Sequence, residues 1–265
     1  SAAILGGSFD VSISGTALNL AVGDPNIDPL VAGRAEVAVQ ARRSGDGFEL
    51  RMFELTSPAG EIMAHGVLKD QGSMVDLRVV LNDAGDVIPE LAGPLRVIAT
   101  AEQRAKTWDI RADLTGPSGA GANISGQLDD LRITGALPLA LANPFVRPRQ
   151  LQGVADFDLA LKGTPRLENL SGRITTNAAR FSAPNLRVAL EDINTNLTIR
   201  DAGVDVDLAA KVASGGTLDV SGRAGLTDRM MADLRATLKV AVFADPRLYQ
   251  TQVSGALRLF GPLTG

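Results

Sequence analysis

Few residues in this chain have side chains suited to catalysis. The sequence has one histidine, His65, and no cysteine. Without cysteine there is no thiol nucleophile and no disulfide, and a Ser-His triad or a transition-metal site would depend on His65 alone. A single histidine on a strand is more often structural or exposed than catalytic. We therefore predict that the protein is not an enzyme.

Carboxylates are common, but their spacing is typical of a solvated surface. Asp205 and Asp207 lie two residues apart, which places them together on the outer face of a strand. A carboxylate pair could hydrolyse a glycosidic bond, but such pairs recur along the whole chain. The loops at 44–47 and 82–86 match no twelve-residue calcium loop. Gly215-Gly216 precedes no helix, so it forms no phosphate cradle. We expect no metal and no cofactor.

Composition excludes several other classes of protein. There are 26 basic and 30 acidic residues, a net charge of −4, which does not suit a nucleic-acid partner. No apolar run is long enough for a membrane-spanning helix. The first residue begins in mid-pattern and no signal peptide precedes it, so we expect a piece of a longer protein.

Period-two alternation identifies the elements that carry these residues. From Val204 to Val212 every second residue is apolar and most of those between are polar, and the pattern resumes after the Ser214–Gly216 turn. This pattern predicts a β-hairpin with one apolar and one polar face, and it recurs along most of the chain. A parity change at Phe53 predicts a bulge, and the parity changes again after Asp192 and around Gly255. The fold class predicted is all-β, with consecutive strands joined by Gly, Pro and Asp turns.

The apolar face must be covered, and three arrangements could cover it. A second sheet could stack on it, the sheet could close on itself as a barrel or β-helix, or an open trough could hold an apolar ligand. One Trp and one Tyr are too few for the aromatic girdles of an outer-membrane barrel. Alternation alone favours a self-filled sandwich or helix, although the many small residues would fill a closed core poorly.

Several motifs occur in an order that resembles the TamB family. They are the run from Gly163 to Ile174, the segment Phe181–Val188, the turn Leu190–Ile193 and the closing segment Ser254–Leu263. The resemblance covers roughly residues 150 to 265 and is looser before that. Each motif is weak alone, and their order carries the resemblance.

The resemblance implies an elongated, U-shaped curled sheet, a β-taco, with an apolar concave interior and a polar exterior. It implies one continuous fragment over residues 1–265, with an irregular break near 139–150. It also implies a periplasmic location, within an inner-membrane-anchored protein of a Gram-negative bacterium whose anchor this fragment lacks. The expected role is a conduit for phospholipid acyl chains between the two membranes, support for outer-membrane protein assembly, or both.

The expected partners are phospholipids, a TamA-like outer-membrane barrel protein and outer-membrane protein clients. The alternative is a β-helical or sandwich module of the structural or adhesin type with a self-filled core. The candidate residues lining the lipid groove are all apolar residues of the second half of the chain: Leu159, Leu161, Leu186, Val188, Leu190, Leu197, Ile199, Val204, Val206, Leu208, Val212, Leu218, Val220, Leu234, Leu238, Val240 and Val242.

Overall fold

The computed structural model describes residues 7–21, 23–24, 28–70, 72–88, 91–186, 188–226, 230–245 and 249–262, without the side chains of 186 and 243–250. The described part contains seventeen strands in one large antiparallel sheet that is not closed. The all-β prediction is confirmed. The antiparallel pairing contradicts the β-helical alternative, because a parallel β-helix stacks parallel strands, and one sheet does not make a sandwich.

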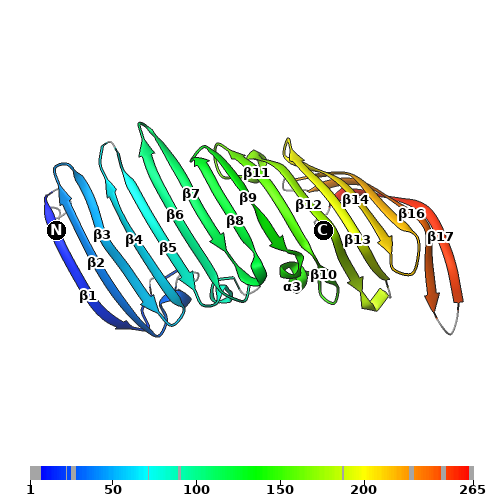
Figure 1. Ribbon diagram of the computed structural model, residues 1–265, viewed down its shortest axis with the longest axis horizontal. Coiled ribbons are helices and arrows are strands. Elements are labelled where there is room, and N and C mark those ends of the chain that lie inside the picture. The colour runs from blue at the N-terminus through cyan, green and yellow to red at the C-terminus, as the bar shows by residue number, and fades with distance from the viewer. Residues whose placement is uncertain are drawn as a thin grey trace. The chain divides into compact units, whose positions relative to one another are not determined.

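The chain divides into two compact units, Ser1–Leu131 and Arg132–Gly265. In each unit, strands that follow one another in sequence lie side by side (Figure 1). The prediction of one continuous fragment stays a prediction.

Unit 1 is a meander of strands joined mostly by short turns, with longer connections between β1 and β2 and between β5 and β6. Consecutive strands pair antiparallel, from β1 with β2 through β7 with β8. The strands are β1 (Phe9–Leu18), β2 (Arg34–Ser44), β3 (Gly47–Ser57), β4 (Gly60–Leu68), β5 (Met74–Leu81), β6 (Leu95–Arg104), β7 (Thr107–Thr115) and β8 (Gly121–Gln127). The short helices are α2 (Asp28–Val31), η1 (Ala84–Asp86) and η2 (Pro117–Gly119).

Unit 2 continues the same topology. Strands β10 and β11 both pair with β12. Consecutive strands then pair from β12 with β13 through β16 with β17. The strands are β9 (Asp130–Pro138, which begins at the end of unit 1), β10 (Gln150–Gln152), β11 (Val154–Lys162), β12 (Leu170–Ala183), β13 (Val188–Arg200), β14 (Gly203–Val212), β15 (Thr217–Gly225), β16 (Met231–Asp245) and β17 (Tyr249–Pro262). The short helices are η3 (Leu139–Ala142), α3 (Asn143–Val146), η4 (Leu167–Asn169) and η5 (Pro184–Leu186). The stretch predicted to be irregular, 139–150, contains η3 and α3.

Bulges interrupt the alternation where the parity of the sequence changes. The register shifts between Leu50 and Phe53 in β3, and between Glu191 and Asn194 in β13. A third shift lies on β16, where Lys239 and Val240 lie opposite the single residue Ser254 of β17. The parity changes at Phe53 and after Asp192 therefore coincide with extra residues in β3 and β13. The parity change expected around Gly255 is wrong, because the extra residue lies on β16 and not on β17.

Candidate functional site

The most extensive surface feature of unit 2 is one apolar sheet face. Residues paired directly across antiparallel strands lie on the same face, so the register joins side chains into rows. We call these rows the apolar face of unit 2. One row runs through six strands in pairing order: Phe157, Ile174, Leu197, Val206, Gly222 and Leu234, and ends at Leu259 of β17.

Very little of this face is fully buried. Its best-packed part is a cluster of Ala179, Ile193 and Ala210, against which Phe181 and Leu208 pack among others. No large side chain in the described part of the chain is below 2% exposed. Most side chains of the apolar face are half-buried, because the side chains that contact them belong to the same sheet. It therefore keeps apolar surface available for contact.

The register places most of the expected residues on this face. The residues it brings there are Leu159, Leu161, Val188, Leu190, Leu197, Ile199, Val204, Val206, Leu208, Val212, Leu218, Val220, Leu234 and Leu238. The side chain of Leu186 lies outside the described part of the structure. That the face encloses a groove stays a prediction.

Val240 and Val242 do not belong to this face. Unbroken alternation along β16 would keep them in line with Leu238, but two residues of β16, Lys239 and Val240, lie opposite the single residue Ser254. After this bulge Ala241 pairs with Val253 on the apolar side and is fully buried, whereas Val242 pairs with Gln252 on the other side. The expectation for both valines was wrong because the bulge reverses the parity.

Local geometry explains how the bulge is held. Val240 has φ of 50° and is 53% exposed, which is an unfavourable conformation for a β-branched residue. Its backbone N–H, which has lost a ladder partner, donates to the Ser254 hydroxyl at 2.9 Å. The contact between the Ser254 hydroxyl and Val240 does not alter the apolar alternation of either strand, so the sequence pattern alone could not predict it.

The opposite face of unit 2 carries ion pairs across the strands. Asp205 accepts from Arg200 Nε at 2.7 Å and from Arg223 Nη1 at 2.8 Å. Asp233 binds Arg258 through two hydrogen bonds of 2.7 Å. These hydrogen bonds hold the pKa values of Asp205 and Asp233 below the usual range of a carboxyl group. Asp205 and Asp233 are therefore partners of arginine, and Asp205 is not a free catalytic acid.

His65 makes the one arrangement that resembles part of a catalytic triad. Its Nε2 lies 3.1 Å from Asp76 Oδ2, and Asp76 accepts a hydrogen bond of 2.8 Å from the Thr100 hydroxyl. A triad needs the hydroxyl on the histidine, so that the imidazole can take its proton. Here the hydroxyl donates to the carboxylate instead, and the His65 side chain is 61% exposed. The order of contacts does not activate Thr100 as a nucleophile.

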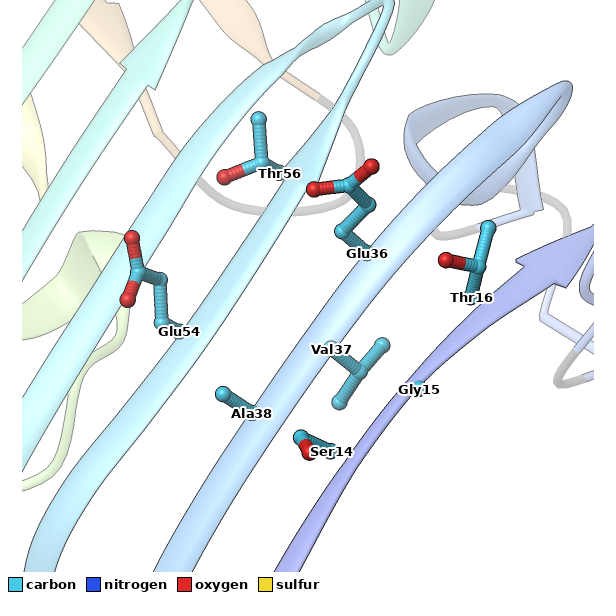
Figure 2. A pocket seen from close by; sticks show the side chains of 8 residues that line it. All are labelled: Ser14, Gly15, Thr16, Glu36, Val37, Ala38, Glu54 and Thr56. Carbon is cyan, nitrogen blue, oxygen red and sulfur yellow. The ribbon is translucent and has the colours of Figure 1, made fainter.

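Hollows on the polar faces also lack a reactive arrangement. One, of about 370 Å³, crosses β1, β2 and β3 in unit 1 (Figure 2). Glu36 lies between Thr16 and Thr56, and Glu54 lies in the adjacent row. A second, of about 480 Å³, lies at the β12 and β13 bulges of unit 2. Its lysines face aspartates in two exposed ion pairs, Lys211–Asp192 and Lys239–Asp219.

The sequence matches the model of a known protein family. The family model for the type II secretion system (T2SS), protein N, matches residues 86–263. The match covers about two thirds of the chain and includes almost all of unit 2. The chain belongs to the T2SS protein N family. No curated protein and no solved structure matches it.

Membership of the T2SS protein N family corrects the resemblance to TamB. It overturns the expected lipid-transfer role, the phospholipid and TamA-like partners and the outer-membrane protein clients. A glycine in one of these motifs has a structural cause. At Gly172, and likewise at Gly222, φ is positive and a Cβ would lie about 2.2 and 2.1 Å from a carbonyl oxygen of the neighbouring strand. These two glycines allow close strand packing, whereas a Cβ at Gly15 or Gly255, in two other Ser-Gly pairs, would meet no atom within 4 Å.

Protein N of the type II secretion system is a periplasm-facing component anchored in the inner membrane. Among the described residues of this chain, none of the helices has the length and apolar character needed to cross a membrane.

Proposed function

We propose that this chain is a periplasmic, non-enzymatic component of a type II secretion system. In this role it presents its long antiparallel sheet to another component of the same machine. The observation that carries the proposal is the match of residues 86–263 to protein N of that system. The expected location in the periplasm of a Gram-negative bacterium is part of the proposal.

The two faces of unit 2 support a role in contact rather than in chemistry. The apolar face carries half-buried Val, Leu and Ile side chains across neighbouring strands, whereas the opposite face is occupied by arginine–aspartate pairs. Exposed apolar surface of this extent typically marks an interaction site. The proposal also includes the curled, U-shaped sheet that the resemblance to TamB implied, with the apolar face on its concave side.

The experiment compares neighbouring positions on one strand. Val220 of β15 is half-buried on the apolar face, and Ser221 is exposed on the polar face. In a strain whose own copy of the gene is deleted, we would express the wild type, Val220→Asp or Ser221→Asp. A type II exoprotein would then be quantified in the medium and in the periplasm, and each variant's cellular amount would be measured by immunoblot.

We expect the deletion to leave exoprotein in the periplasm, and the wild type and Ser221→Asp to restore its release. At equal cellular amounts, Val220→Asp should fail to restore release, because its charge disrupts the apolar contact. If the deletion strain releases the exoprotein normally, the proposed function is wrong. If Val220→Asp is present at the wild-type amount and restores release fully, the apolar face is not the contact surface.

A further inference from the structure

The only histidine of the chain shares the polar face of unit 1 with a methionine. Alternation along β4 places Met63 on the same face as His65, two residues before it. Their partners on β5 are charged, since Met63 pairs with Arg78 and His65 pairs with Asp76. The Met63 side chain is 37% exposed. Packing in an apolar core therefore does not account for a methionine at this position.

The bulge in β3 brings a second methionine to His65. Two residues of β3, Arg51 and Met52, lie opposite the single residue His65. The half-buried Met52 pairs with Gln40 of β2 on the polar face. The Arg51 guanidinium is drawn away, because its Nη1 lies 3.4 Å from Asp10 Oδ2 of β1, beyond β2 on the side of β3 away from β4. An uncharged thioether is therefore the neighbour of His65 on this side.

The spacing of these three positions allows their side chains to converge. Cβ atoms directly opposite each other in an antiparallel sheet are about 4.5–5.5 Å apart, as for Met52 and His65. Residues two apart on one strand, such as Met63 and His65, are separated by about 7 Å. A methionine side chain has three rotatable bonds, so its sulfur can turn toward the imidazole from either position.

Asp76 holds the imidazole from the β5 side. Nε2 of His65 lies 3.1 Å from Asp76 Oδ2, and the other carboxylate oxygen accepts a hydrogen bond of 2.8 Å from Thr100. A carboxylate beside Nε2 favours the proton on that nitrogen, so that Nδ1 carries the lone pair. Within the described part of the chain, Nδ1 has no hydrogen-bond partner. Histidines that bind metal ions usually have one nitrogen fixed by a carboxylate in this way.

The donor set selects the kind of ion. Among the residues that the structure describes, no three His, Cys, Asp or Glu side chains are grouped to hold a metal ion. Thioethers extend this set, and the expectation of no metal had left them out. Soft thioether ligands together with imidazole suit Cu(I). We propose that His65, through Nδ1, and the sulfur atoms of Met52 and Met63 bind one Cu(I) ion.

Met74 lies on the same face but outside this site. It pairs with Val67 of β4, so about 13 Å of strand separates its row from that of Met63. It also belongs to β5, the side of His65 that Asp76 occupies. Its side chain is 40% exposed, similar to that of Met63. Met74 is therefore a matched control for an exposed thioether that does not belong to the site.

The experiment measures Cu(I) affinity without oxygen, in competition with a colorimetric Cu(I) chelator. The proteins are the purified wild type, the ligand variants Met52→Leu, Met63→Leu and His65→Gln, and the control Met74→Leu. Leucine nearly conserves the volume of methionine but has no sulfur, so the fold should be retained. Circular dichroism checks the fold of each variant.

We expect the wild type to bind one Cu(I) ion per chain. Each ligand variant should bind it at least about tenfold more weakly, because even changes behind the ligands cost about 10–100-fold in affinity. Asp76→Asn keeps all three ligands but loses the carboxylate that fixes the imidazole, so we expect a loss of about tenfold. Met74→Leu should bind like the wild type.

A wild type that binds Cu(I) no more tightly than the three ligand variants would overturn the proposed site. Equal weakening by Met74→Leu, Met52→Leu and Met63→Leu would also overturn it, because exposed thioethers would then collect the ion wherever they lie. None of these measurements involves secretion, so the proposed function and the Cu(I) site can fail separately.

Discussion

The bulge at Val240 makes two valines of unit 2, one on β14 and one on β16, respond differently to the same substitution. Val206 lies half-buried on the apolar face, paired with Leu197 and Gly222. Val240 is 53% exposed, with φ of 50°. Regular alternation along β16 would make the two positions equivalent. The structure predicts that replacement by glycine destabilises the protein only at Val206.

The magnitudes follow from burial and backbone conformation. Val206→Gly loses about half of a valine's burial energy, roughly 1 kcal/mol. It also gains chain flexibility costing about 0.5–1 kcal/mol. Val240→Gly has the same flexibility cost and a similar loss of contact, but it relieves about 1–2 kcal/mol of left-handed strain. We therefore expect Val240→Gly to lie between about 0.5 kcal/mol more stable and about 1 kcal/mol less stable than the wild type, and Val206→Gly to be about 1.5–2 kcal/mol less stable.

The assay is equilibrium unfolding in urea, followed by circular dichroism, on the wild type and both variants. The free energy of unfolding falls linearly with urea concentration. If the three proteins share the same slope, a change in the midpoint urea concentration reports a change in stability. If Val240→Gly loses as much as Val206→Gly, the valine at 240 is packed in a regular strand, and the description of the β16 bulge is wrong.

Three further predictions concern the core, the strand contacts and the polar face. Ile193→Ala should lower the unfolding free energy by about 2–3 kcal/mol in urea titrations, because it opens a cavity in the best-packed cluster. Gly222→Ala should cost about 2 kcal/mol or more, since a Cβ there would lie 2.1 Å from the Asp233 carbonyl oxygen; a change near zero would contradict the close contact. The arginines lower the pKa of Asp205 below its ordinary 3.8 in the folded state, so its stabilising effect should be full above that pH and be lost as pH falls through the folded pKa. Asp205→Asn should flatten that part of a stability–pH curve, and an unchanged curve would contradict the ion pairs.

Period-two alternation was sufficient to predict the strands and their apolar side. The row through Leu197, Val206 and Leu234 was identifiable because a strand exposes every second residue to one face, and the meander keeps neighbouring rows in register. The parity change at Phe53 also predicted the bulge in β3, and the parity change after Asp192 coincides with a bulge in β13. Side-chain alternation and bulges depend on residues close together in the chain, so the sequence alone can predict them.

The predictions were wrong where apolar alternation in the sequence does not determine the three-dimensional arrangement or the family. The bulge in β16 was not predicted, and a parity change was expected on β17 instead, because Val240 and Val242 preserve apolar alternation through a residue with φ of 50°. The family was misassigned because the resemblance rested on the order of individually weak motifs. In one of these motifs, Gly172 is needed for close strand packing, which unrelated meanders need equally. What lies against an apolar face is decided by another molecule, and no periodicity within one chain encodes it.

The claim that the apolar face contacts another part of a type II secretion system can be tested by photo-cross-linking in cells. A photoreactive amino acid would replace Val206 on the apolar face or, as the control, Asp207 on the polar face, and the adducts would be identified by mass spectrometry. The account predicts that position 206 links to another component of the secretion system and that position 207 does not. Adducts from position 206 that contain only proteins outside that system would contradict it.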